Sequence, residues 1–425
     1  MGPTIILDKS SLQALSKKEL ILLNKLYLVN IPPVLTIEIL ADLKKTDDPN
    51  ALNENGVIEI SNKLIQKDNA VNVHYLNSVI SSLMGVDYLD CRCPQIGGAK
   101  KVKDQNGKIG FQVIESPEQA AIKNWQRGDF SEAEKILATQ WRAYSREINL
   151  EELKNNWLSI KNIFPECKYF KTLLMIVDFW LDNPSMQSQL LFLMLEHLRL
   201  EQKYSTSIFY RWESGNDELL KTFAPYFHFI TKIDTAFRLG LVYNLITTRP
   251  TNRIDCEYLY YIPFCNIFSS RDNFHKSFAP HFLAEDQVFI DGDELKSDLN
   301  NIIDLLEKED SYLQIDWDIQ FSIEPPNDEN SFTFKMWKKY YPSWSPGWFY
   351  KKSDFPQKDS KTSQEINDRV NTFEEIEFDP FEKFNDDEID FISIEKHISL
   401  EDQCVCGSGK KFKECCYKEG MKPDA

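Results

Sequence analysis

The sequence predicts an α/β protein whose parallel sheet is interrupted by a long helical region. Two observations support this. Short apolar runs at residues 4–7, 266–270 and 288–290 have the length of buried strands, and each is followed within two residues by an aspartate. Between the first run and the other two, from Ser116 to about Leu245, nearly every segment has the apolar spacing of helices.

Residues 1–100 open as a strand followed by two helices. The apolar run at residues 4–7 predicts the strand. Ser16 and Glu19 have the spacing of a capping box, so a helix should begin there and carry the apolar residues that follow. Two prolines then break the chain, and we expect a second helix to begin near Thr36.

The rest of the chain continues the same pattern with one hairpin. Asn106-Gly107 lies between two short polar-apolar runs, which predicts a β-hairpin over residues 103–113. After residue 253 we expect a helix beginning at Asp255, the strands at 266–270 and 288–290, and an amphipathic helix from about Leu295 to Leu306.

The negative charge is concentrated in one segment. The formal net charge of the 425 residues is −17, which argues against a surface that binds nucleic acid by bulk charge. Residues 354–402 hold sixteen acidic and five basic residues, a net charge of −11, and leave about −6 for the remainder. We interpret this segment as a flexible acidic linker.

The sequence indicates a cytoplasmic protein without membrane contact. No apolar run approaches the length of a membrane span, and the first residues lack the features of a secretory signal. Scattered cysteines favour free thiols in a reducing compartment. These are Cys91, Cys93, Cys167, Cys256 and Cys265.

The chain ends in a compact cysteine cluster. Cys404, Cys406, Cys415 and Cys416 provide four thiolates within thirteen residues, enough to close a tetrahedral Zn²⁺ site. A segment this short has almost no apolar core, so the metal would supply its folding energy. The alternative is a set of reactive free thiols.

This cluster resembles the SEC-C motif, a zinc-binding element appended to many bacterial proteins. The resemblance covers about 20 residues and includes Cys-x-Cys, Gly-Ser-Gly-Lys-Lys, an aromatic residue and Cys-Cys. It implies that the four cysteines are structural zinc ligands with no open coordination position. It also implies docking to a protein or ribosomal partner.

Four dispersed acidic residues suggest a second metal site. Asp8 and Asp272 follow apolar strands, and aspartates at the carboxyl ends of adjacent parallel strands meet at the same edge of a sheet. Glu38 and Asp255 belong to predicted helices that could lie over that edge. Carboxylates gathered in one place repel each other, and Mg²⁺ or Mn²⁺ would satisfy them with oxygen ligands.

These stretches resemble a PIN-like domain, an α/β nuclease fold. That family has an Asp after the first strand, a Glu on an early helix, an Asp at a later helix and an Asp after a late strand, an order matched by Asp8, Glu38, Asp255 and Asp272. The resemblance implies metal-dependent cleavage of RNA, less readily of DNA, and a role as a toxin or antiviral defence effector. Ser10 and Ser270 would be supporting hydroxyls. Glu38 and Asp255 are 217 residues apart, so the helical middle must be an insertion.

The full predicted architecture is therefore a PIN-like parallel-sheet domain with a large all-helical insertion and a small C-terminal zinc-binding motif. The predicted parts are the two PIN-like halves, the helical insertion between them, the acidic linker and the zinc motif. The PIN-like halves are residues 1–100 and 251–352, and the helical insertion is 101–250. The acidic linker is 353–402, and the zinc motif is 403–420.

Structural roles stand beside these functional ones. Asp8, Asp255 and Asp272 are each good candidates for helix N-caps, and Glu38 could be a solvated helix residue. Asp291, at the end of the run 288–290, is a fifth and weaker acidic candidate. The six scattered histidines give no sign of a catalytic triad.

An aromatic and basic stretch at residues 334–352 is a candidate for substrate contact. Rings and lysines interleave there, as stacking and phosphate attraction of a single strand would require. The candidate residues are Lys338, Lys339, Trp344 and Trp348. The favoured alternative is a final strand and an extended segment that pack these rings onto the core.

Two hypotheses of function follow. The first is a metal-dependent nuclease with a zinc tail for partner docking. The second is a non-enzymatic adaptor that binds protein or ribosomal partners through the helical region and the SEC-C motif.

Overall fold

The computed structural model of the chain describes residues 2–46, 51–64, 69–86, 89–97, 99–103, 109–113, 115–198, 200, 202–215, 219–308, 323–346 and 374–375. The chain divides into two compact units. The first is Met1–Gln95 with Glu118–Pro346, and the second is Ile96–Pro117 with Gly347–Ala425.

The first unit is built on a five-stranded sheet in which all neighbouring strands are parallel, in the order β3-β2-β1-β6-β7. The strands are β1 (Thr4–Leu7), β2 (Leu28–Ile31), β3 (Asn69–Val71), β6 (Ile267–Ser270) and β7 (Val288–Asp291). The chain runs outward from β1 to β3 and later returns to β6 on the other side of β1. The α/β prediction is confirmed, and the strand order reverses between β1 and β6.

The two central strands end level with each other. Ile5 pairs with Ile267 and Leu7 with Ser269, and the backbone N–H of Asp8 donates to the carbonyl of Ser269 over 3.2 Å. Every residue of both strands is buried, as expected for a parallel sheet covered on both faces. The residues that directly follow the two strands therefore lie side by side at one edge of the sheet. Asp8, which follows β1, is one of them.

Helices near the N-terminus differ from the prediction at one boundary. Helix α1 (Lys9–Ala14) follows β1, and α2 (Lys17–Leu26) begins with the predicted Ser16–Glu19 capping box. The next helix, α3 (Pro33–Ala41), begins three residues before Thr36. Proline is well suited to the first helical position because its fixed φ matches the helix and its missing N–H has no intrahelical partner there.

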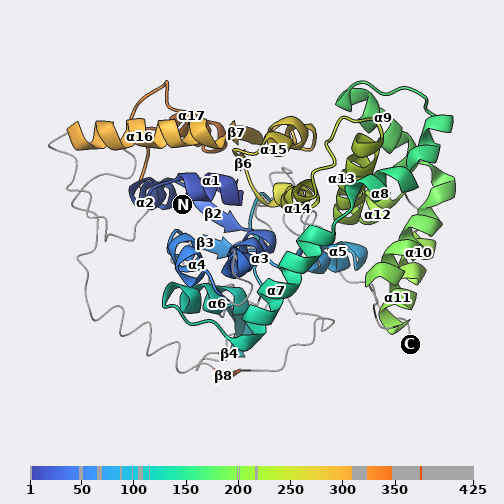
Figure 1. Cartoon of the computed structure of the whole chain (residues 1–425), viewed down its shortest axis with the longest axis horizontal. Helices are drawn as coiled ribbons and strands as arrows, with labels where there is room; N and C mark the ends of the chain where they lie inside the picture. The colour runs from blue at the N-terminus through green and yellow to red at the C-terminus, as the bar shows by residue number, and fades with distance from the viewer. Residues whose placement is uncertain are drawn as a thin grey trace. The chain divides into compact units, whose positions relative to one another are not determined.

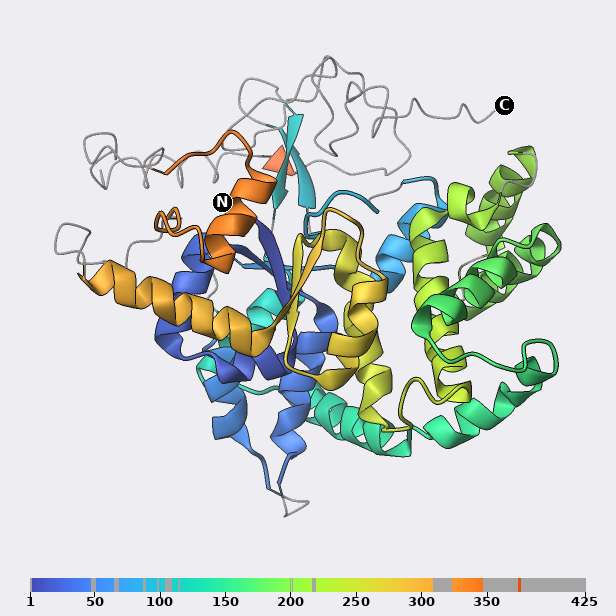
Figure 2. The same ribbon diagram turned by 90° about the horizontal axis from the view of Figure 1, so that it is seen from above.

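The helices after residue 250 also differ from the sequence prediction in places. Helix α14 (Thr251–Tyr258) begins at Thr251 rather than at Asp255, directly after Pro250. Helix α16 (Gly292–Lys308) is amphipathic as predicted, and α15 (Asn273–Phe278) joins β6 to β7. The stretch predicted to hold a final strand contains a helix instead, α17 (Phe332–Tyr340), which lies beside α16 (Figures 1 and 2).

Most of the remaining helices are gathered to one side of the sheet (Figure 1). In chain order, the remaining α-helices are α4 (Glu54–Ser61), α5 (Tyr75–Leu83), α6 (Pro117–Gln126), α7 (Glu132–Glu147), α8 (Leu150–Asn156), α9 (Phe170–Leu181), α10 (Gln187–Leu198), α11 (Gln202–Ser214), α12 (Leu220–Phe223) and α13 (Pro225–Val242). The helical character predicted from Ser116 to about Leu245 is confirmed for the described residues.

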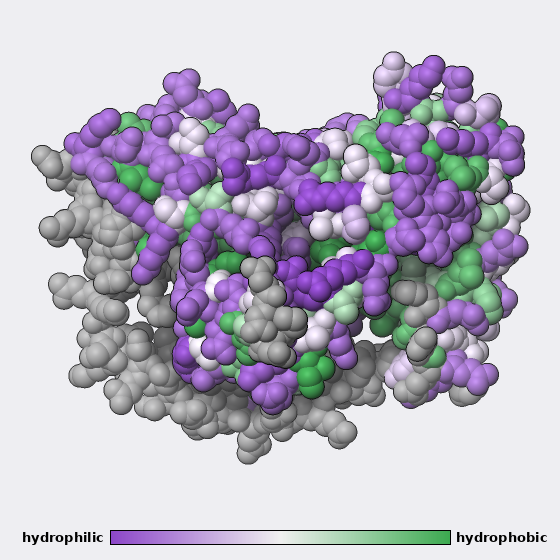
Figure 3. Space-filling view, viewed as in Figure 1, coloured by the Kyte–Doolittle hydropathy of each residue, from purple (hydrophilic) through white to green (hydrophobic). Residues whose placement is uncertain are grey.

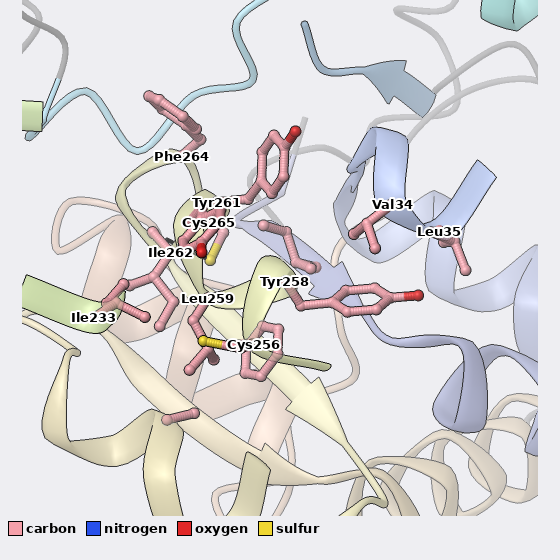
Figure 4. Packing of buried hydrophobic residues seen from close by; sticks show 14 of the residues in the cluster. Val34, Leu35, Ile233, Cys256, Tyr258, Leu259, Tyr261, Ile262, Phe264 and Cys265 are labelled. Carbon is pink, nitrogen blue, oxygen red and sulfur yellow. Dashed lines mark hydrogen bonds between the residues drawn. The ribbon is translucent and has the colours of Figure 1, made fainter. Parts of the chain in front are cut away.

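One hydrophobic core joins these helices to the sheet. Figure 4 shows side chains from α14 and the following short helix η4 (Leu259–Phe264) between Val34 of α3 and Ile233 of α13. Tyr258 and Leu259 are almost completely buried there. Packing of this kind fixes α14, and with it Asp255, relative to α3 and the sheet.

Helix α17 is attached to α16 through one buried carboxylate. Asp298 accepts hydrogen bonds from the backbone N–H groups of Phe332 (2.8 Å) and Thr333 (2.9 Å) and from the Thr333 hydroxyl (2.6 Å). We expect Asp298→Ala to lower the free energy of unfolding by about 2 kcal/mol, because three buried donors would lose a charged acceptor. Chemical denaturation measures this. Asp304→Ala, an exposed aspartate on the same helix, should have little effect, and equal losses would contradict the prediction.

The second unit contains the predicted hairpin. Strand β4 (Ala99–Lys103) pairs antiparallel with β5 (Ile109–Val113) and with β8 (Glu374–Glu375). The predicted Asn106-Gly107 turn lies outside the described residues. So do the zinc motif and, apart from β8, the acidic segment. Among the described residues, no helix is long and apolar enough to span a membrane.

Candidate active site

Asp8 is held at the end of β1 by three hydrogen bonds. Its side chain is 4% exposed. Oδ1 accepts from the backbone N–H of Ser11 (2.9 Å), and Oδ2 accepts from the hydroxyls of Ser10 (2.7 Å) and Ser270 (2.8 Å). The carboxylate caps α1, as one interpretation predicted, and it also contacts both serines predicted to support it.

A buried histidine links Asp8 to α14. His275 Nδ1 lies 2.8 Å from the Ser270 hydroxyl and 3.6 Å from Asp8 Oδ2, while Nε2 lies 2.8 Å from the carbonyl oxygen of Asp255. Burial alone would lower the pKa of His275, but Asp8 and Asp255 raise it to about 9. Burial alone would raise the pKa of Asp8, but His275 and the hydroxyl of Ser10 lower it to about 2. Asp8 is therefore ionised at neutral pH.

Asp255 has the opposite character. It lies inside α14, so the prediction that it caps a helix is wrong. Its Oδ2 is buried and has no hydrogen-bond partner among the residues that the structure describes. Burial raises the pKa of Asp255 to about 7, and the charges of Glu38, Asp272 and Asp8 act in the same direction.

Glu38 lies on α3 and is half-buried rather than fully solvated. One of its carboxylate oxygens accepts a hydrogen bond from the Tyr258 hydroxyl. Burial raises the pKa of Glu38, Lys9 and Tyr258 oppose the rise, and the charges of Asp8 and Asp42 add to it. Glu38 therefore shares the electrostatic environment of Asp8 and Asp255.

Asp272 and Asp291 follow neighbouring strands but differ in surroundings. Asp272 caps α15 by accepting from the N–H of Phe274 (2.7 Å), and its Oδ2 lies 3.5 Å from Arg249 Nη1. Its backbone N–H donates to the Ser270 hydroxyl, which also contacts Asp8. Asp291 forms an ion pair with Lys276 instead. The contacts therefore join Asp272, but not Asp291, to the group around Asp8.

Contacts within the described residues connect four of the five acidic candidates and leave out Asp291. Ser270 contacts Asp8 and the backbone of Asp272, and His275 connects Ser270 to the backbone of Asp255. Tyr258, on the same helix as Asp255, donates to Glu38. On the surface, a hollow rimmed by hydrophilic residues lies between α3 and α14 (Figure 3). In the part of the chain that the structure describes, no three His, Cys, Asp or Glu side chains are arranged to hold one metal ion as they stand.

Three further residues of this site were missed by sequence reasoning. His275 follows Asp272 by three residues, and Glu257 follows Asp255 by two. Both are therefore within three residues of a predicted site residue. Burial raises the pKa of Glu257 to about 7 against the charge of Arg253. Lys9 lies directly after Asp8, and its Nζ is 2.9 Å from the carbonyl of Glu38.

The aromatic and basic stretch packs largely inward. Trp344 is 3% exposed, donates to Glu324 Oε2 over 3.0 Å, and contacts the ring of Trp337. Lys338 is exposed, and its Nζ donates to the carbonyl of Trp344. Lys339 is also exposed, and Trp348 lies outside the described residues. Nothing in these contacts joins the stretch to the acidic group.

Comparison with known proteins identifies one short segment. Residues 402–418 match the SEC-C motif. No significant match was found among curated proteins or among solved structures. The SEC-C match includes all four cysteines predicted to bind zinc, Cys404, Cys406, Cys415 and Cys416, and it lies outside the residues that the structure describes.

Proposed function

We propose that the chain is a metal-dependent nuclease with a PIN-like domain, and that its substrate is RNA. One observation carries the proposal. Asp8, Glu38, Asp255 and Asp272 gather where the strand order of the sheet reverses, the position at which open α/β sheets bind their ligands. Within the described part of the chain the buried Asp255 Oδ2 accepts no hydrogen bond, and a bound cation would provide a partner.

The donor chemistry fits Mg²⁺ or Mn²⁺. Carboxylate oxygens are their preferred protein ligands, and Mg²⁺ is commonly held by one or two carboxylates together with waters and substrate phosphates. Asp255 and Asp8 would hold the ion, with Glu38 and Asp272 close enough to feel its charge. When bound, such an ion lowers the pKa of a water molecule and stabilises negative charge on a phosphodiester.

The protein's own residues prepare the site. Three hydrogen bonds orient Asp8, and its low pKa keeps it charged at neutral pH. His275 connects the Ser270 hydroxyl to the backbone of α14 and so fixes the position of Asp255 relative to β6. This preorganisation limits the rearrangement needed when substrate binds.

The test is cleavage of single-stranded RNA by the purified full chain. We expect cleavage with Mn²⁺ or Mg²⁺ and none with EDTA. A preparation that cleaves equally well in EDTA, or not at all with either metal, would contradict the proposal.

The SEC-C motif supports a second, structural metal. We expect one zinc ion per chain, bound by Cys404, Cys406, Cys415 and Cys416, measurable by elemental analysis of protein purified without chelator. Cys404→Ser should lower the zinc content, whereas Cys167→Ser, a buried cysteine elsewhere, should not. Zinc-free wild-type protein would remove this part of the proposal. By the same resemblance, the motif would dock a protein or ribosomal partner.

A non-enzymatic adaptor is the second candidate, favoured by exposed apolar side chains on the helical region. Contiguous exposed apolar surface often marks protein interaction sites. The residues are Ile163, Tyr169, Met175, Phe179, Phe192, Leu193 and Tyr210. An adaptor would show no divalent-dependent cleavage and would co-purify with a partner.

A further inference from the structure

We propose that Arg142 and Arg249 bind the phosphodiester backbone of the substrate beside the acidic site. The inference rests on the proposed nuclease function and adds to it by assigning residues to substrate binding. It gives the helical region, which contributes Arg142 through α7, a direct part in the site.

Arg142 reaches the acidic group through Asp42. Its Nη2 lies 3.6 Å from Asp42 Oδ1, while Lys9 Nζ lies 2.7 Å from Asp42 Oδ2. Asp42 follows Glu38 by four residues at the end of α3, and residues with this spacing lie one turn apart on the same helix face. Arg142 is therefore paired with a carboxylate that lies one helical turn from Glu38, a proposed metal-site residue.

One nitrogen of the Arg142 guanidinium differs from the one that faces Asp42. The Arg142 Nε is buried and makes no hydrogen bond to any residue that the structure describes. Buried N–H groups almost always have a partner, because leaving one unpaired is costly. The region thus contains an unpaired donor on Arg142 and an unpaired acceptor on Asp255. The Arg142 side chain as a whole is 30% exposed, so a phosphate beside the acidic group can reach its guanidinium, and a divalent cation would give the Asp255 carboxylate a partner.

Arg249 provides a second positive charge beside Asp272. Its side chain is 61% exposed, and its Nη1 lies 3.5 Å from Asp272 Oδ2, longer than an ordinary charged hydrogen bond. Asp272 already accepts from Phe274. The guanidinium therefore keeps donors for a phosphate. Because the chain as a whole is acidic, attraction of a polyanion depends on such local charges.

The test measures binding without cleavage. Fluorescent single-stranded RNA and DNA oligonucleotides are titrated with the full chain in EDTA. Three proteins are compared: the Asp8→Asn variant, and the same variant with either Arg142→Gln or Arg249→Gln added. We expect each arginine substitution to weaken binding about fivefold at about 0.1 M salt and to reduce the slope of log K against log salt by about 0.7, the effect of one lost phosphate contact on a single strand. Arg142→Lys should retain the slope.

Arg127→Gln is the matched control, because it removes the same charge from an exposed position after α6. It should leave affinity and slope unchanged, and melting temperatures check that each variant is folded. Unchanged binding by folded Arg142→Gln and Arg249→Gln proteins would overturn the inference, as would an equal loss in Arg127→Gln.

Absence of metal-dependent cleavage by the wild type is a separate result, which would count against the nuclease and not against arginine-dependent binding. Similar affinity for RNA and DNA would show that the arginines read the phosphates alone, and tighter RNA binding would add a 2′-hydroxyl contact.

Discussion

Replacing Asp8 with asparagine should lower metal-dependent RNA cleavage about a thousandfold, because the site would lose the charge of a carboxylate that is ionised and held in place by hydrogen bonds. Asparagine is the informative substitution. It can still accept from the Ser11 N–H and cap α1, although it loses the charge that faces His275, so the melting temperature should fall while the protein remains folded. Alanine would remove the cap and cost about 1 kcal/mol of stability. The measurement is single-turnover cleavage with Mn²⁺, together with thermal denaturation.

Asp291→Asn is the control for this experiment. Asp291 also ends a strand of the same sheet, but it pairs with Lys276 rather than with the acidic group. We expect this variant to retain cleavage. Undiminished cleavage by Asp8→Asn would contradict the site assignment, and equal losses in the two variants would mean that the active site is not confined to the group around Asp8.

The second large effect concerns stability. Asp255→Asn should make the metal-free protein more stable by about 1 kcal/mol at pH 8, because it removes a buried, unpaired charge that three other carboxylates repel. The same variant should lose the stabilisation that Mn²⁺ gives the wild type. For a ligand that binds only the folded state, that stabilisation is about 2.7 kcal/mol at about one hundred times the dissociation constant.

Thermal denaturation with and without Mn²⁺ measures both effects, and pH provides an internal control. The pKa of Asp255 is raised to about 7, so its destabilising contribution develops as pH rises from the unfolded value of about 4 through 7 and is absent in acid. The advantage of Asp255→Asn should therefore shrink at pH 5. A variant that is less stable at pH 8, or that responds to Mn²⁺ like the wild type, would contradict the assignment.

The sequence was sufficient to predict those site residues whose position depends on the neighbouring residues in the chain. Asp8, Ser270 and Asp272 were predicted because each lies at or just beyond the end of an apolar run, and strand ends in a parallel sheet meet at one edge. Helix starts were less accurate. Asp255 was placed at a helix start, but Pro250 allows the helix to begin four residues earlier, at Thr251.

What the sequence could not provide is burial created by distant contacts. His275 has no distinguishing pattern, and its complete burial results from packing among the rings of Phe268, Phe274 and Tyr258. Arg142 lies on a helix one hundred residues after Asp42, and only the packing of α7 on α3 brings the two together. Such pairings depend on tertiary structure and leave no local signal.

The pairing of β1 with β6 has a consequence for the order of events during synthesis. Ile5 pairs with Ile267, which is 262 residues later (267 − 5), so β1 must wait for those residues before it gains its second neighbour. Closing such a long loop is slow and follows local helix formation. On the ribosome, the acidic group stays incomplete until residues beyond His275 have emerged. A nascent chain therefore carries no assembled site, and any activity of that site begins only after the polypeptide that forms it is well advanced.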